Sequence, residues 1–171
     1  MRRWCAAAIG LTAVATMLAP GAGAAQKTGA VQVYAAGSGV TTPILFTGVI
    51  TDHGTATSVT KTGKVMNNGN YEKIVLTKGG FWVDATQLNK LLNHIKPTFS
   101  KTQCWFAFKG SGPTKLMKGT GAYTGVTGTV NVTVNFVQIL PKLPSGKCNF
   151  SNSAKPVASY GDVTGSGTAS Y

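Results

Sequence analysis

The feature that most constrains the fold is a strict alternation of apolar and polar side chains. It is clearest over residues 130–136, where three valines and Phe136 alternate with Asn131, Thr133 and Asn135. Successive side chains of a β-strand point to opposite faces, so this period of two predicts a strand with one buried face. β-branched residues, which suit strands, agree with the pattern. The further strand candidates are residues 31–35, 44–51, 55–60, 71–77, 80–83, 102–109 and 157–171.

One segment has helical periodicity instead. Its apolar residues recur at helical spacing between Leu88 and Ile95, and Pro97 follows. Asp84 and Gln87 are spaced as a capping box at the start of this helix. Roughly eight short strands with Gly-rich turns and one short helix are typical of a single β-sandwich or closed barrel. Residues 110–113 and 141–146 are expected to be loops inside that domain.

The N-terminus has the three parts of a secretory signal peptide. Arg2 and Arg3 precede an apolar stretch over residues 4–18, and a run of small residues follows over residues 21–25. The apolar stretch is shorter than the roughly 20 residues of a membrane-spanning helix. We therefore expect residues 1–24 to be a cleaved signal peptide and residues 25–171 to be one domain. The mature protein is then expected to be extracellular or in the cell envelope.

The chain is strongly basic, with sixteen Lys and Arg against four Asp and Glu and a net charge of +12. Removal of Arg2 and Arg3 would leave +10, and every remaining cation would be Lys. The lysines are spread without a dense run, and Arg is the residue best suited to bidentate base and phosphate recognition. We therefore expect no specific nucleic-acid partner, but a non-specific affinity for an anionic envelope surface.

Cleavage would also remove Cys5 and leave Cys104 and Cys148. Two thiols in an exported chain predict one disulfide, and the alternative is two free buried thiols. A bond across 44 residues would stabilise the fold by about 4 kcal/mol in the chain-entropy model.

The scarcity of acids limits the possible catalysts. Glu72 is expected to share a strand face with Ile74 and Leu76. A carboxylate among apolar neighbours has a raised pKa, which makes Glu72 the candidate general acid or base. The alternative is an exposed Glu72 on an edge strand. The spacing of the two His and the Cys residues does not match a zinc site, and neither a metal nor a cofactor is expected.

The Gly-rich stretch from Gly119 to Gly128, which contains Tyr123, resembles a signature of the allene oxide cyclase-like barrel superfamily. That superfamily includes plant allene oxide cyclases and dirigent proteins. Residues 46–54, which end in Asp-His-Gly, are similar to its first long strand, and residues 161–171 resemble its last. The mature chain also resembles secreted actinobacterial proteins that carry this barrel. The resemblance implies an eight-stranded antiparallel β-barrel whose lumen accepts a small hydrophobic molecule.

The catalytic residues of allene oxide cyclases are not retained. Where those enzymes carry a Glu and an Asn before the Asp-x-Gly, this chain has Thr47 and Val49. Leu45, Thr47 and Val49 share a face and would line an apolar lumen if that face points inward. Tyr71 and Tyr123 are the polar groups expected beside the ligand. The alternative is an interior packed solid with side chains.

Three functions follow from these observations. The leading one is a secreted, non-catalytic barrel that binds a small lipophilic molecule in its lumen. The second is an isomerase or cyclase that uses Glu72 with Tyr71 or Tyr123. The third is a structural or adhesive protein of the cell envelope that uses its lysine-rich exterior.

Overall fold

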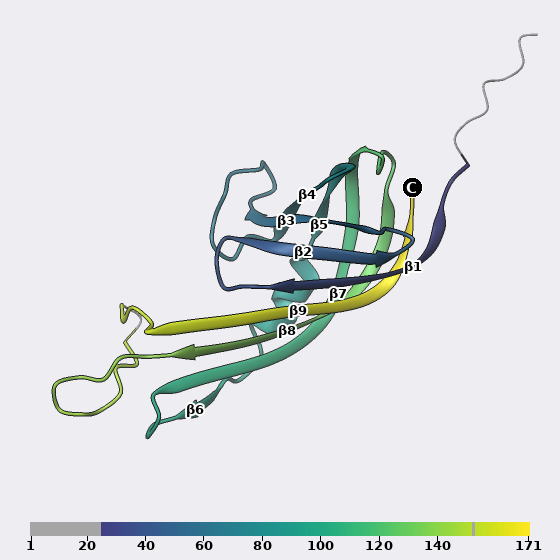
Figure 1. Ribbon diagram of the computed structural model, residues 1–171. Coiled ribbons are helices and arrows are strands. Elements are labelled where there is room, and N and C mark those ends of the chain that lie inside the picture. Colours follow the sequence, from purple (N-terminus) through teal and green to yellow (C-terminus); the bar gives the residue numbers. More distant parts are fainter. Residues whose placement is uncertain (1–24, 152) are drawn as a thin grey trace, which may run out of the picture.

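Figure 1 shows the computed structural model, which describes residues 25–151 and 153–171. The expected signal peptide, residues 1–24, lies outside the described residues. Strands and one helix follow one another along the described chain as β1 (Thr28–Ala36), β2 (Thr41–Gly48), β3 (Asp52–Val59), β4 (Tyr71–Leu76), β5 (Gly79–Asp84), α1 (Thr86–Leu92), β6 (Thr98–Ser100), β7 (Trp105–Gly121), β8 (Thr127–Ile139) and β9 (Ala158–Ser170).

Eight of these strands close into a barrel. The hydrogen-bonded order is β5-β4-β3-β2-β1-β9-β8-β7, all neighbours are antiparallel, and pairing of β5 with β7 completes the circle. The short strand β6 pairs with the beginning of β7 outside this circle. The expected eight-stranded antiparallel barrel with one short helix is therefore confirmed. Closure removes sheet edges that would otherwise pair with other chains.

Buried apolar side chains project into the interior of the barrel and pack against one another. Phe46 and Phe81 meet edge to face with ring centroids 5.3 Å apart. The buried apolar residues form one cluster, and the described interior is a packed core of the kind that eight-stranded barrels can hold. Its members are Val31, Val33, Ile44, Phe46, Ile50, Ala56, Ile74, Leu76, Phe81, Val83, Ala85, Leu88, Leu116, Tyr123, Val126, Val130, Val132 and Ala169.

The helix packs closely against β7. Leu88 of α1 is buried, and a Cβ atom at Gly112 would lie only 2.9 Å from the Leu91 Cδ1 atom. A larger residue at Gly112 would therefore push the helix away. Residues 110–113, which were expected to form a loop, lie within β7. That expectation was wrong because the glycine here makes room for the helix rather than forming a turn.

The start of α1 also differs from the expected capping box. Asp84 is the last residue of β5, and Ala85 occupies the N-cap position without a side-chain cap. The Asp84 carboxylate still accepts a hydrogen bond from the backbone N–H of Thr86 at 2.9 Å. The capping-box prediction was wrong because one more residue separates the strand from the helix.

Strands β7, β8 and β9 are longer than the barrel and continue past it toward the lower left of Figure 1, where β6 joins them. The ladder between β1 and β9 ends at Ala36 and Asp162, and one further hydrogen bond joins the Gly37 N–H to the Gly161 carbonyl, so residues 158–160 have only β8 as a strand partner. We call residues 98–108, 136–151 and 153–161 the extension. It comprises β6, these strand ends and the loop between β8 and β9.

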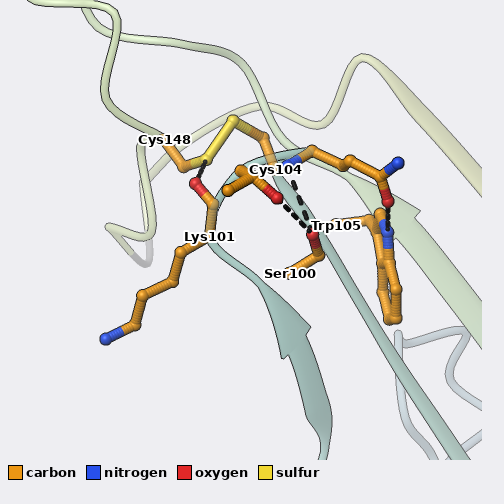
Figure 2. The surroundings of a disulfide bond; sticks show 7 residues. Ser100, Lys101, Cys104, Trp105 and Cys148 are labelled. Atoms are coloured by element: carbon orange, nitrogen blue, oxygen red, sulfur yellow. Dashed lines mark hydrogen bonds between the residues drawn. A yellow bond between two sulfur atoms is a disulfide. The ribbon is translucent and has the colours of Figure 1, made fainter.

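A disulfide ties the far end of the extension together. Cys104 precedes β7 and bonds to Cys148 in the loop between β8 and β9, with Cα atoms 5.1 Å apart (Figure 2). The predicted disulfide is therefore confirmed. The Cys148 sulfur also lies 2.9 Å from the carbonyl oxygen of Lys101 in the turn after β6. The disulfide thus fixes the long β8–β9 loop against the β6–β7 turn.

Candidate functional site

Phenylalanine rings cover the face of the extension that continues from the barrel interior. Phe106 and Phe108 of β7 share this face with Phe136 of β8, and Phe99 of β6 lies opposite Phe106. Phe150 reaches the same cluster from the disulfide-bonded loop.

These five rings form a continuous series, which we call the phenylalanine ladder. The centroid distances between successive rings, in the order Phe150, Phe99, Phe106, Phe136 and Phe108, are 5.7, 6.0, 5.9 and 5.4 Å. The ladder holds five of the seven phenylalanines of the chain. Phe99 is 52% exposed and Phe150 is 40% exposed. Rings in such a series present one wide apolar surface.

The opposite, outer face of the extension is apolar as well. Two neighbouring rows of paired residues cross β7, β8 and β9: Trp105, Ile139 and Ala158 in one, and Ala107, Val137 and Tyr160 in the other. Ile139 is 44% exposed and Tyr160 is 59% exposed. The next outward row toward the barrel is polar and holds Lys109, Asn135 and Asp162. The apolar outer surface therefore ends where the barrel begins.

The charges of the extension are all positive. Lys101, Lys142, Lys147 and Lys155 are exposed there. The sequence of the extension contains no Asp or Glu, so its net charge is +4. Exposed apolar side chains and uncompensated cations thus occupy the same part of the molecule.

A second cluster of polar groups closes one end of the barrel around Asp52. This carboxylate is 5% exposed and accepts a 2.7 Å hydrogen bond from the Tyr123 hydroxyl. It also accepts bonds from the Thr77 hydroxyl and from the backbone N–H groups of His53, Thr77 and Lys78. Asp52 thereby joins the start of β3 to the β4–β5 turn and the β7–β8 turn.

Burial by itself would raise the pKa of the Asp52 carboxyl, but these hydrogen bonds outweigh it and hold the pKa well below its usual range. Burial raises the pKa of Tyr123, and the hydrogen bond to the Asp52 carboxylate raises it further. Tyr123 therefore remains a neutral donor. The hydrogen bond joins the start of β3 to the β7–β8 turn as a structural contact.

Glu72 lies at the other end of the barrel. It pairs with Ser58, six residues along β3 from Asp52, which corresponds to about 20 Å of strand. Burial raises the pKa of Glu72 from its ordinary 4.5 to about 7, although the Ser58 hydroxyl partly offsets this. As expected from the sequence, Glu72 lies on the same face of β4 as the buried Ile74 and Leu76.

The proposed catalytic partners do not assemble. Tyr71 lies on the other face of β4 and contacts Trp82, with ring centroids 6.3 Å apart. Tyr123 bonds to Asp52 at the opposite barrel end from Glu72. The structure therefore does not bring Glu72, Tyr71 and Tyr123 into one site.

The face of β2 that was expected to line a lumen points the other way. Ile44 and Phe46 are buried inside, whereas Leu45 is 45% exposed on the outer surface and Thr47 lies on the same outer face. Only Val49, beyond the end of β2, packs against the core. The expected inward orientation of Leu45 and Thr47 is thus corrected. Both faces of this segment carry apolar residues, so the pattern alone did not decide which face is buried.

Two hollows of the structure open on the outside of the barrel. One, of about 350 Å³, is rimmed by Lys73, Trp82 and Lys118, and the Lys118 ammonium lies 4.4 Å from the Trp82 ring centroid. The other, of about 300 Å³, is lined by polar residues such as Gln32 and Thr133. Glu72 lines neither of them.

Residues 25–151 and 153–171 contain no group of three or more His, Cys, Asp or Glu side chains placed to hold a metal ion. Among the same residues, no helix is long and apolar enough to cross a membrane. Comparison with family models, curated proteins and solved structures finds no match for this chain.

Sequence reasoning missed the extension as a site. Its phenylalanines come from four separate segments, and the strand register together with the disulfide-bonded loop brings them together. Residues 105–108 could have indicated the site, because four consecutive apolar residues make both faces of one strand apolar.

Proposed function

We propose that the protein is a non-catalytic binding protein for a lipophilic molecule, and that the molecule binds on the phenylalanine ladder rather than inside the barrel. The observation that carries this proposal is the ladder itself. Large exposed apolar patches on soluble proteins mark binding sites for ligands, proteins or membranes. Seven of the thirteen large hydrophobic side chains that are exposed in the described chain belong to the extension.

The packed interior supports the same location. The interior of the barrel holds a cluster of buried apolar side chains, which supports binding outside the barrel. Glu72 has a pKa suited to acid–base chemistry, but it lies apart from Tyr71 and Tyr123, so the arrangement favours binding over catalysis. We also propose that the protein acts outside the cell and that it is related to the allene oxide cyclase-like barrels. The barrel topology and the disulfide are compatible with both.

The test is a titration with a fluorescent long-chain fatty acid below its micelle-forming concentration. The variant Phe99→Ser/Phe150→Ser removes the two outer rings of the ladder. Because each half-exposed ring contributes about 1 kcal/mol on transfer from water, the affinity should fall at least about tenfold.

The matched control is Leu45→Ser/Val75→Ser, which removes two similarly exposed apolar side chains from the barrel wall. It should bind the fatty acid like the wild type. Equal losses in both double variants, or a loss in the control alone, would place binding away from the ladder. Organic extraction of the purified protein followed by mass spectrometry should in addition recover a lipophilic compound above background.

A further inference from the structure

The extension differs from an ordinary ligand site because both of its faces are apolar. The phenylalanine ladder covers one face, and the rows that contain Trp105 and Tyr160 cover the other. A small ligand or a single docking partner would cover one face and leave the other in water. An environment that surrounds the extension would cover both.

We infer that the extension inserts into the interfacial region of an anionic lipid bilayer. This inference rests on the proposed function and names the lipophilic ligand as membrane lipid. Charge complementarity selects the lipid class, because four exposed lysines and no acid lie within the extension. Each Lys near an anionic membrane surface strengthens binding by about fivefold.

The depth of insertion follows from the positions of the polar groups. Four residues separate Trp105 from the polar row at Lys109, which corresponds to about 13 Å of strand. Lysines also occupy the far loops of the extension, at Lys101 and Lys147. Charges at the far end keep the extension at the level of the lipid headgroups.

The unpaired backbone groups at the edges of the extension indicate the same depth of insertion. Within the described chain, β6 pairs with β7 only, and residues 158–161 at the start of β9 pair as a strand with β8 only. The Gly37 N–H and the Ser38 hydroxyl donate hydrogen bonds to the Gly161 and Ser159 carbonyls, but the rest of this edge has no strand partner. Open sheet edges of this kind do not occur in the hydrocarbon region, where unpaired N–H and C=O groups are costly. Trp105 and Tyr160 suit the interface, since their rings are apolar and their tips are polar. The Trp105 indole N–H already donates to the Gln103 side chain at 2.9 Å (Figure 2).

The experiment is flotation of the full chain with vesicles of phosphatidylcholine alone and of phosphatidylcholine mixed with phosphatidylglycerol. Every variant carries residues 1–24, so any contribution of that segment is common to all samples. We expect the mixed vesicles to bind at least about tenfold more strongly, and this preference should shrink at high salt, which screens the charges.

Two pairs of variants test whether the lysines and the rings of the extension contact the vesicle. Lys101→Gln/Lys147→Gln should weaken binding to the mixed vesicles by about 25-fold, whereas the exposed barrel lysines in Lys61→Gln/Lys64→Gln should have little effect. Phe99→Ser/Phe150→Ser should reduce binding at least about tenfold, and Leu45→Ser/Val75→Ser should not. Circular dichroism and alkylation of any free thiol check that each variant folds and keeps its disulfide.

Brominated lipids give a second readout. They quench the fluorescence of a tryptophan that enters the bilayer, and the quenching should decrease in Trp105→Phe. Vesicle binding that ignores lipid charge, or that survives the extension variants, would overturn the inference. If the wild type binds the fatty acid through the ladder but does not float with vesicles, the proposed function stands and the membrane inference fails. Ultracentrifugation that shows a dimer dissolved by Phe99→Ser/Phe150→Ser, without vesicle binding, would also overturn it.

Discussion

The buried contact between Tyr123 and Asp52 allows a sharp test of how the barrel end is held together. Tyr123→Phe removes one hydroxyl and keeps the ring. The edge-to-face contacts of the ring with Phe81 and Tyr171, at centroid distances of 5.8 and 5.2 Å, should therefore persist. The lost interaction is a 2.7 Å hydrogen bond to a carboxylate that is 5% exposed.

Hydrogen bonds to charged groups contribute about 1.5–3 kcal/mol, so we expect the free energy of unfolding to fall by about 2 kcal/mol. For a domain of this size the melting temperature should fall by roughly 4–8 °C. Chemical denaturation at neutral pH measures the first quantity, and calorimetry measures the second. Tyr160→Phe is the control, because the Tyr160 side chain is 59% exposed, and its effect should stay within about 0.5 kcal/mol.

The pH dependence adds a second check. The pKa of Asp52 is depressed in the folded state, so its stabilising contribution is present above the unfolded value of about 3.9 and is lost as the pH falls toward the folded value. The stability gap between the wild type and Tyr123→Phe should therefore narrow only below about pH 4. A Tyr123→Phe variant as stable as Tyr160→Phe at neutral pH would refute the assigned role of the bond.

Two further predictions concern Glu72 and the disulfide. Because the folded pKa of Glu72 is raised to about 7, wild-type stability should decrease as the pH rises from about 4.5 to about 7, and Glu72→Gln should lack this decrease and be about 2 kcal/mol more stable at pH 8. Denaturant titrations across that pH range measure the free energy of unfolding of both proteins. The same pH dependence of stability in the wild type and in Glu72→Gln would contradict the prediction. Cys104→Ser/Cys148→Ser should lower the free energy of unfolding by about 4 kcal/mol and weaken fatty-acid binding, since the loop that carries Phe150 is released. Unchanged binding would show that the bond does not position Phe150.

The barrel class was predictable because its strands obey the two-residue period. Val130 and Val132 point inward as the alternation requires, and α1 falls where the leucines recur. The period did not predict the outward orientation of Leu45, because both faces of that segment carry apolar residues, and in the structure the face with Ile44 and Phe46 is buried. The prediction of a loop at Gly112 was also wrong, because this glycine lies in a strand and makes room for the helix.

The candidate site was harder to predict because it depends on contacts between segments distant in the sequence. Phe99 and Phe150 belong to β6 and to the loop between β8 and β9, which the disulfide joins to the β6–β7 turn. The placement of Glu72 on one strand face with Ile74 and Leu76 was predictable, because it depends only on the local alternation. The contact of Asp52 with Tyr123 spans 71 residues of sequence and needed the closed barrel.

Photo-cross-linking identifies the residues of the extension on which a lipophilic molecule is proposed to bind. A fatty acid with a photoreactive group in its acyl chain is bound, irradiated and mapped by peptide mass spectrometry. We expect cross-links in the extension, with the highest yield around Phe99 and Phe150, the outermost rings of the ladder. Cross-links concentrated on inward-facing residues of the barrel, such as Phe46 or Ile74, would contradict it.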